Sequence, residues 1–348
     1  MLDRSIGFDP DDRTARPLGA RQRGFIALAE GFAALGHRVE ARRAGGADLD
    51  LNGVAWRQID SDAAPFDGLG MDRVLAWRDP VLLAHSSIVR GAGCWLWFDG
   101  DVALLDDAGA RLTMLSHKAR LFFPDKRQKS AFADDLAIAA RVTAPGACPA
   151  FVAAGQDHTG FAARQPVAVT VAGWQDGLVD IIATWNDHVL RGTDDTVLEV
   201  YSADLCDALA GLESPVSDAV ADLVRDSLGK GVRVCKPMAE QDMATRIAGA
   251  RAWLHHGKGK GKGATAHDHV GQWLCDALAA GTPVVSFGGI ANDRLENGRT
   301  GYIVPDAPAY GNVVTQLLGD KTFFDSLSAA ACKDVRVWQD VAADLEKF

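Results

Sequence analysis

Short apolar runs alternate with helical patterns along the whole chain, and this alternation is the feature that most constrains its fold. A helix face with Gly36 as its C-terminal stop separates the first two runs. Apolar runs in the first half occupy residues 5–8, 37–41, 73–77 and 94–98. Those in the second half occupy residues 167–172, 196–201, 232–235 and 252–254, with helical patterns at 178–190, 215–228 and 240–250. Such alternation predicts an α/β protein with parallel sheets covered by helices.

The pattern stops and restarts once, around a Pro- and Gly-containing segment at residues 145–165. A chain of 348 residues is long enough for two cores. We therefore expect two doubly wound, Rossmann-like domains facing an interdomain cleft. The expected boundaries are 1–155 for the first domain and 165–332 for the second. Residues 333–348 form a closing helix with an apolar face of Trp338, Val341 and Leu345.

The stretch Ala264–Pro305 carries the densest set of signals. It predicts an amphipathic helix, a glycine stop, a buried strand, a Gly-Gly turn and another short strand. Asp268 and Asp276 stand eight residues apart, which is about 12 Å along a helix at roughly 1.5 Å per residue. This separation suits two ends of one extended ligand and is too long for two acids acting on one atom.

Charge and cysteine content exclude several classes of protein. The net charge of −10 argues against a broad nucleic-acid surface, so we expect no nucleic-acid partner. The six cysteines are scattered, which favours buried free thiols in a reducing compartment over disulfides or a zinc site. The first residues have no signal-peptide pattern, and no apolar run is long enough for a membrane span. We expect a cytoplasmic protein, and a peripheral contact at the inner membrane face is compatible with this.

The second half resembles the nucleotide-binding domain of retaining GT-B glycosyltransferases of the E-x7-E, family 4-like type. The similar segments are AVTVAGWQDGLVDIIATW, GVRVCKPMAEQDMATRIAGARAWL and LCDALAAGTPVVSFGGIANDRLENGRTGYIVP. The first half is similar more weakly, through PLGARQRGFIALAEGFAALGHRV, RVLAWRDPVLL and WLWFD. The closing VWQDVAADLEKF resembles the family's helix that crosses back to the N-terminal domain. The resemblance covers nearly the whole chain, with its most specific motifs in residues 267–305.

This resemblance implies a site for a nucleotide-diphosphate sugar. Asp268 would contact the sugar as a catalytic residue, and Asp276 would hold the ribose. Gly288, Gly289 and Ile290 would bring backbone amides to the donor, since glycine lets the chain approach a ligand closely. A helix N-terminus attracts a pyrophosphate, and a carboxylate beside the sugar suits transfer with retention of anomeric configuration. Either Asn292 or Asp293 could replace the acid that follows this turn in the family.

The acceptor side of the resemblance has its own candidates. Asp99 is the second catalytic candidate, and Gly19 with Arg21 forms an acceptor-side loop in place of the family's Gly-Gly loop. Phe98 stands where the family often has a His. The segment AGWQDGLVD has no basic residue, although the family has an Arg and a Lys there for the donor phosphates.

A glycine- and lysine-rich loop follows the 252–254 run. Its Lys258, Lys260 and Lys262 could wrap around a phosphate and replace the missing Arg/Lys pair. The loop is not a Walker A motif, and a solvated surface loop explains it equally well.

Two further sets of side chains, four histidines and five tryptophans, have alternative interpretations. His255, His256, His267 and His269 flank Asp268, but their spacing matches no zinc-binding helix motif, and we expect no metal and no cofactor. The tryptophans 77, 95 and 97 are best explained as core residues. Trp56 and Trp174 could either pack in the core or stack on a sugar or base.

The predicted function is retaining transfer of a sugar from a nucleotide-diphosphate sugar to a glycan, lipid-linked or protein acceptor. A degenerate GT-B domain that binds a nucleotide or a partner without catalysis is the first alternative, favoured by the missing basic pair and Phe98. A sugar-nucleotide epimerase is the second, disfavoured by the paired acids of the 264–305 stretch.

Overall fold

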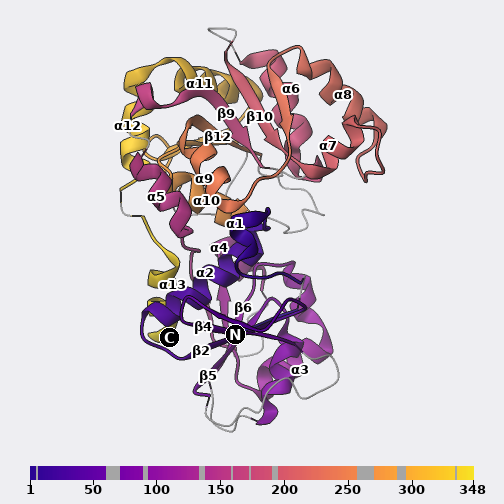
Figure 1. Cartoon of the computed structure of the whole chain (residues 1–348), viewed down its shortest axis with the longest axis vertical. Coiled ribbons are helices and arrows are strands. Elements are labelled where there is room, and N and C mark those ends of the chain that lie inside the picture. The colour runs from indigo at the N-terminus through magenta and orange to yellow at the C-terminus, as the bar shows by residue number, and fades with distance from the viewer. Residues whose placement is uncertain are drawn as a thin grey trace. The chain divides into compact units, whose positions relative to one another are not determined.

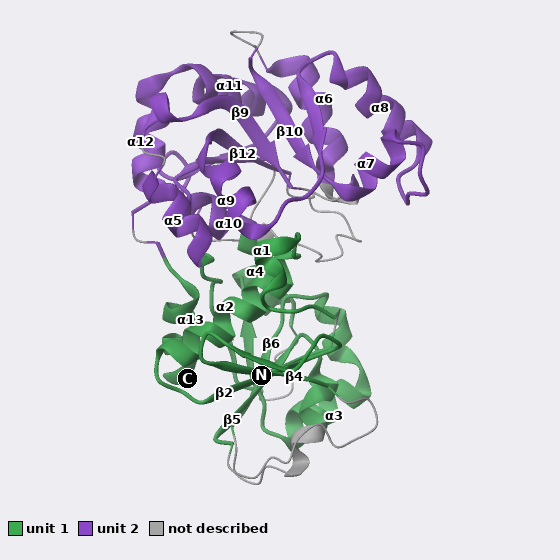
Figure 2. Cartoon of the chain, viewed as in Figure 1, with its two compact units in different colours: residues 1–148, 265–272, 336–348 green, residues 149–264, 273–335 purple. Residues whose placement is uncertain are grey.

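The computed structural model divides the chain into two compact units (Figure 2). It describes residues 1–348 except 5–6, 60–70, 89–92, 133–137, 158–159, 172–173, 190–194, 257–269, 288–294 and 334. Unit 1 comprises Met1–Cys148, Thr265–Gln272 and Arg336–Phe348, and unit 2 comprises Pro149–Ala264 and Trp273–Val335. Unit 1 is therefore assembled from separate segments of the chain, including its last helix.

Unit 1 contains a mostly parallel sheet with the strand order β3-β4-β2-β1-β5-β6-β7-β8. Figure 1 labels its strands β2, β4, β5 and β6. Only β3 runs antiparallel to its neighbour, β4, among the described pairs. The strands are β1 (Leu2–Asp3), β2 (Val39–Arg43), β3 (Leu49–Leu51), β4 (Val54–Gln58), β5 (Arg73–Trp77), β6 (Gly93–Trp97), β7 (Arg120–Phe123) and β8 (Ala140–Val142). The order reverses between β1 and β5, because β2 lies on one side of β1 and β5 on the other.

Helices cover both faces of this sheet, which explains why its central strands β5 and β6 are almost continuously apolar. The helices and 3-10 segments are α1 (Asp12–Ala15), α2 (Ala20–Ala34), η1 (Pro80–Ile88), η2 (Val102–Asp106), α3 (Ala108–Ser116), α4 (Lys126–Ala131) and α13 (Trp338–Glu346). Alternate residues of β6 point to opposite faces of the sheet. Leu96 belongs to a core that includes side chains of η1, η2 and α3, while Trp95 lies beside Phe32 of α2. Helix α13 packs along α2, where Gly31 allows close backbone approach.

Unit 2 contains a parallel sheet with the strand order β11-β10-β9-β12-β13-β14. The strands are β9 (Gln165–Thr170), β10 (Val197–Tyr201), β11 (Val232–Cys235), β12 (Ala250–His256), β13 (Val284–Phe287) and β14 (Gly301–Val304). Its order reverses between β9 and β12, since β10 lies on the other side of β9. This is the doubly wound arrangement expected from the alternation of runs.

The unit 2 helices divide between the two faces of its sheet. They are α5 (Pro149–Asp157), α6 (Val179–His188), α7 (Ala203–Leu209), α8 (Asp218–Leu228), α9 (Glu240–Ala248), α11 (Ala307–Gly319) and α12 (Lys321–Ala331), together with α10 (Val270–Ala279), whose residues up to Gln272 belong to unit 1. Side chains of α6, α8, α11 and α12 share one core with alternate residues of the strands. Short 3-10 (η4, Phe161–Ala163) and π-helical (η5, Trp174–Leu178) turns flank β9.

The predicted α/β class with two Rossmann-like, parallel-sheet domains is confirmed. Two of the predicted segments differ in the structure. The first strand lies at Leu2–Asp3, and within the expected 5–8 run Phe8 lies in a loop, where it is buried against Phe25 and Trp56. Helix α5 lies inside the segment expected to be a linker, and its Phe151 is buried.

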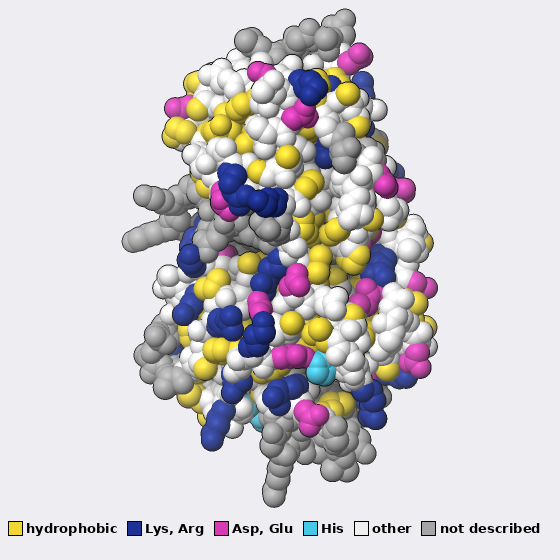
Figure 3. Space-filling model, turned by 90° about the vertical axis from the view of Figure 1, so that its left-hand side faces the viewer, with side chains coloured by type: hydrophobic (Ala, Val, Ile, Leu, Met, Phe, Trp, Pro, Cys, Tyr) yellow, Lys and Arg dark blue, Asp and Glu magenta, His cyan; other side chains and the backbone are white. Residues whose placement is uncertain are grey.

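The charged side chains and the cysteines are distributed as the composition suggests. On the face shown in Figure 3, basic and acidic side chains are interspersed instead of forming separate fields. All six cysteines are free, and Cys94, Cys148 and Cys275 are buried while Cys332 is exposed. No helix within the described residues is long and apolar enough to cross a membrane.

Candidate functional site

The carboxyl ends of the central strands of unit 1 bring polar side chains to one edge of the sheet. Asp3 ends β1, Arg78 follows β5, and Asp99 lies just beyond β6. Helix α2 begins beside them with Ala20 and Arg21. In doubly wound sheets, ligands bind at this edge, where the strand order reverses.

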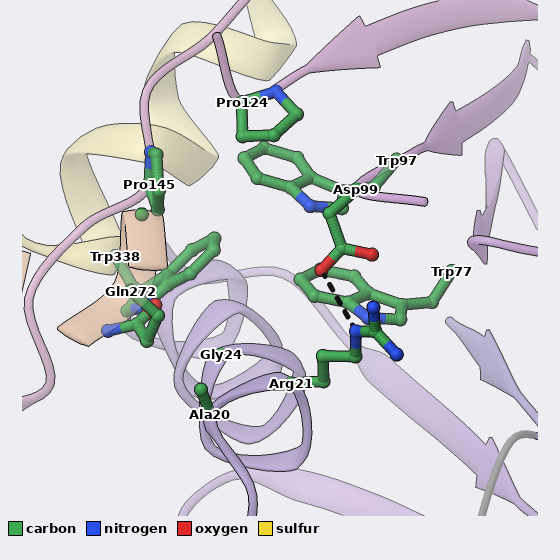
Figure 4. Close-up of a pocket in the computed structure, with 11 residues that line it drawn as sticks. Ala20, Arg21, Gly24, Trp77, Trp97, Asp99, Pro124, Pro145, Gln272 and Trp338 are labelled. Atoms are coloured by element: carbon green, nitrogen blue, oxygen red, sulfur yellow. Dashed lines mark hydrogen bonds and ion pairs between the residues drawn. The ribbon is translucent and has the colours of Figure 1, made fainter. Parts of the chain in front are cut away.

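Asp99 lies between two arginines. Its Oδ1 is 2.5 Å from Nε of Arg78, and its Oδ2 is 3.7 Å from Nε of Arg21. All three side chains are largely buried, with exposed fractions of 17% for Asp99, 19% for Arg78 and 20% for Arg21. Figure 4 shows the Arg21–Asp99 pair beside the indole of Trp77.

Burial dominates the electrostatics of this cluster. It raises the pKa of Asp99, although the guanidinium groups of Arg21 and Arg78 both act to lower it. Burial likewise lowers the pKa of Arg21 to about 10, with Asp99 opposing the change and Arg78 adding to it. The site is therefore desolvated enough for charge interactions to be strong.

Arg78 owes its position to an unusual backbone. Its φ of +66° lies in the left-handed region, which costs a non-glycine residue about 1–2 kcal/mol. The Arg78 amide donates a 2.7 Å hydrogen bond to the carbonyl of Trp97, which fixes this turn at the end of β5. Backbone strain of this kind concentrates at functional sites.

Aromatic rings form the floor of the pocket. Trp77 and Trp97, paired across β5 and β6, stack with ring centres 5.3 Å apart and an interplanar angle of 7°. Trp338 of α13 packs on both, and its Nε1 donates to Oε1 of Gln272 at 3.2 Å. Gly24 makes room for Trp338, because a Cβ there would lie 3.0 Å from the indole. The remaining lining residues include Pro124, Pro145 and Gly271.

Unit 2 has its own cluster where its strand order reverses. His256 ends β12, and its Nε2 lies 3.3 Å from Oδ2 of Asp180, in the first turn of α6. The His256 ring also contacts Phe287 of β13, with ring centres 4.7 Å apart. Gly177, whose φ is +83°, allows the π-helical turn after β9 to lie close to the His256 ring. A Cβ at Gly177 would lie 2.5 Å from Nδ1 of His256.

His255, one residue earlier, is buried on the other face of the same strand. Its ring stacks on Trp253 with centres 5.8 Å apart and planes 7° apart. Burial, with a smaller contribution from His256, lowers its pKa to about 3. It is therefore a neutral core histidine at physiological pH.

The predicted site residues fall into three groups. Arg21 and Asp99 meet in the unit 1 pocket, and Gly19 is the N-terminal cap of α2. Asp276 lies in α10 of unit 2 with a fully buried side chain. Asp268, Lys258, Lys260, Lys262, Gly288, Gly289 and Ile290 lie outside the described residues, as do His267, His269, Asn292 and Asp293.

The structure decides the aromatic alternative for Trp56. Trp56 is fully buried among Phe8 and Phe25, so it packs in the core. Trp174 is half-buried beside the unit 2 core. Phe98 points into the core against Phe123, away from the pocket. Among the described residues, no group of three His, Cys, Asp or Glu side chains is arranged to hold a metal ion.

Sequence reasoning missed Gln272 and Trp338 as pocket residues and Arg78 as the second arginine beside Asp99. Arg78 directly follows a predicted strand, and its position at the carboxyl end of that strand could have identified it as a site residue. Gln272 and Trp338 are brought to the pocket by long-range packing, for which the sequence has no local signal.

Comparison with known proteins defines the class of fold. No protein-family model matches the chain, and no curated protein matches its sequence. Solved structures do match over nearly the whole length. Sucrose-phosphate synthase from Thermosynechococcus elongatus has a TM-score of 0.68 at 13% identity, covering 99% of this chain and 97% of that one. WaaG, a glycosyltransferase involved in lipopolysaccharide biosynthesis, has a TM-score of 0.62 at 14% identity, covering 99% of each chain.

A third match was solved with ligands. HepE from Anabaena, in complex with UDP and glucose, has a TM-score of 0.65 at 12% identity, covering 99% of this chain and 98% of that one. These likenesses establish that the chain has the GT-B fold, as the sequence predicted.

Proposed function

We propose that this protein is a glycosyltransferase that uses a nucleotide-diphosphate sugar. The observation that carries the proposal is the desolvated cluster of Arg21, Asp99 and Arg78, at the strand-order reversal of unit 1 in a chain with the GT-B fold. A buried carboxylate can orient hydroxyls or accept a proton. Unit 1 would bind the acceptor, which is a glycan, a lipid-linked glycan or a protein.

In this proposal unit 2 binds the donor at its own strand-order reversal. The turn after β9 and the N-terminus of α6 lie beside His256 there. The sugar would meet Asp268 and the ribose Asp276, with Gly288, Gly289 and Ile290 as amide donors to the pyrophosphate. Lys258, Lys260 and Lys262 would neutralise the phosphates. The reaction would proceed with retention and without a metal.

Donor binding is the first test. Saturation-transfer NMR or thermal-shift measurements with UDP-, GDP-, ADP- and TDP-sugars should identify one nucleotide that binds. Release of that nucleotide, with and without glycan acceptors, then separates a transferase from a binding protein. Failure of every nucleotide sugar to bind would contradict the proposal.

Variants test the roles of the individual residues. Asp268→Asn should lower turnover by about 10²–10³-fold, which is typical when a transition-state charge contact is lost, and leave nucleotide binding intact. Full activity in this variant would exclude Asp268 as catalytic. Changing Lys258, Lys260 and Lys262 to Ala should weaken nucleotide binding in calorimetry, and unchanged affinity would remove the lysines from the donor site. Turnover in EDTA should equal turnover without it.

A binding protein without catalysis is the second candidate. The specific observation in its favour is that residues 172–180 contain no basic side chain, while Asp180 is paired with His256 at the same turn. If this candidate is correct, the nucleotide sugar binds, and no acceptor causes the release of free nucleotide.

A further inference from the structure

One buried glutamine, Gln272, joins the three chain segments that make up unit 1. It is only 7% exposed, and its amide makes hydrogen bonds to both other segments. Nε2 donates to the carbonyl oxygen of Gly146 at 3.0 Å and to Sγ of Cys148 at 3.4 Å, both in the first segment. Oε1 accepts from Nε1 of Trp338, in the last segment, at 3.2 Å (Figure 4). A single side chain therefore fixes three separate stretches of the chain to one another.

The stretches that Gln272 contacts are themselves held closely together. The Ala147 amide donates a 2.8 Å hydrogen bond to the carbonyl oxygen of Arg336. A Cβ at Gly146 would lie 2.3 Å from the Trp338 amide nitrogen, so the two backbones are in direct contact there. Because hydrogen bonds require a narrow range of distances and angles, an amide whose partners cannot shift is held in one orientation.

The same amide fixes the start of α10, because Gln272 is the third residue of that helix. Asp276 follows four residues later, which places it on the same side of α10, about one turn or 6 Å further along the axis. Both residues are buried, Gln272 at 7% and Asp276 at 0% exposed. Over a single turn an α-helix moves as one rigid element. The hydrogen bonds of Gln272 therefore determine where the Asp276 carboxylate lies.

A buried amide costs free energy unless its groups have partners, so its hydrogen bonds specify an arrangement more than they add to stability. We propose that Gln272 is a positioning residue for the sugar donor: by fixing α10, it holds Asp276 where the ribose of the nucleotide binds. The inference rests on the proposed transferase function and on the ribose contact proposed for Asp276. Gln272 acts through the helix and does not contact the nucleotide itself.

Ribose recognition provides a measurement that a mere loss of stability does not change. The probes for calorimetry on the full chain are UDP, GDP, ADP and TDP, each beside its 2′,3′-dideoxy form. We expect the parent protein to bind the hydroxylated form of one nucleotide about tenfold or more tightly than its dideoxy form, because a hydrogen bond to a charged group is lost. Unfolded protein lowers the apparent affinity for both forms equally, so the ratio of the two affinities reports on the ribose contact.

Two matched variants assign this ratio to Gln272. Gln272→Met keeps an unbranched side chain of similar length and removes the amide, so the ratio should fall close to one. Gln128→Met is the control, because Gln128 is 4% exposed in the same unit and its Nε2 donates to the carbonyl oxygen of Gly100 at 3.1 Å. The control loses a comparable buried hydrogen bond outside α10 and should keep the ratio of the parent. A parent-like ratio in Gln272→Met, or an equal fall in both variants, would overturn the inference.

The parent protein distinguishes failure of this inference from failure of the proposed function. If the parent binds none of the four nucleotides, the transferase function is refuted and the role of Gln272 with it. If the parent binds a nucleotide without preferring the hydroxylated form, the donor site remains, and the ribose contact of Asp276 and the role of Gln272 are both refuted. A strong preference that Gln272→Met retains refutes only the role of Gln272.

Discussion

At the scale of single residues, His255 makes stability depend on pH. The pKa of His255 is lowered from 6.5 to about 3. Between these two pH values the unfolded chain binds a proton at His255 and the folded chain does not. The stability that His255 contributes is therefore complete above about pH 6.5 and is lost as the pH falls toward 3. A difference of three to four pKa units corresponds to about 5 kcal/mol over that whole range.

We expect His255→Phe to flatten this dependence, because Phe can stack on Trp253 without titrating. Between pH 7 and pH 4.5 the free energy of unfolding of the variant should fall by about 2–3 kcal/mol less than that of the parent protein. Urea unfolding at the two pH values measures this. His37→Phe, at an exposed position, should behave like the parent, and an equal fall in all three proteins would refute the assignment.

Gly177 is a residue whose backbone and neighbours both exclude a side chain. Its φ is +83°, and a Cβ would lie 2.5 Å from the His256 ring. Gly177→Ala should lower the free energy of unfolding by more than 1 kcal/mol, since the turn and the ring cannot both stay in place. It should also weaken nucleotide-sugar binding. Parent-like stability measured by denaturant titration would show that the turn adapts.

At the scale of elements, the contact between α2 and α13 depends on Gly31. A Cβ at Gly31 would lie 2.9 Å from the Trp338 carbonyl oxygen and 3.1 Å from the backbone of Gln339. Gly31→Ala should therefore destabilise unit 1 by about 1–3 kcal/mol, although alanine favours helix. Gly319→Ala is the matched control, because Gly319 ends α11 with no atom within 4 Å of its Cβ position. Thermal unfolding of the two variants should differ in this direction, and equal melting temperatures would refute the tight contact.

The helices and strands that were predicted well are those whose apolar residues follow one clear period along the sequence. The 264–305 stretch became α10, β13 and β14, and RVLAW became β5. The β3–β4 hairpin was missed although Asn52-Gly53, both with positive φ, is a typical two-residue hairpin turn. Its strands are short and mixed in polarity, so the period-2 signal is weak. β7 was missed because its apolar run is only Leu121–Phe123.

The candidate site was predictable only in part, for a physical reason. Arg21 and Asp99 stand beside recognisable elements, so their meeting at one sheet edge follows from parallel topology. Arg78 depends on a left-handed turn held by the Trp97 carbonyl, which its own sequence does not encode. Trp338 reaches the pocket through packing of α13, a contact between opposite ends of the chain.

At the scale of the whole molecule, the last helix completes unit 1. Trp338 is buried against Trp77 and Trp97, and Val341 and Leu345 are fully buried. Trp338→Ala should destabilise unit 1 by about 3–5 kcal/mol, the usual cost of removing a buried aromatic side chain. Differential scanning calorimetry should show the transition of unit 1 shifted and that of unit 2 unchanged. A shift of both transitions would mean that the units unfold together.

The divided sequence of unit 1 also has a consequence during synthesis. Its first segment ends at Cys148, and α13 follows only after Arg336, roughly 190 residues later. At 5–20 residues per second a ribosome needs about 10–40 s to make that interval, while domains generally fold as they emerge. During that interval Trp77 and Trp97 lack the contact with Trp338, so the core of unit 1 is completed only when the last helix has been made.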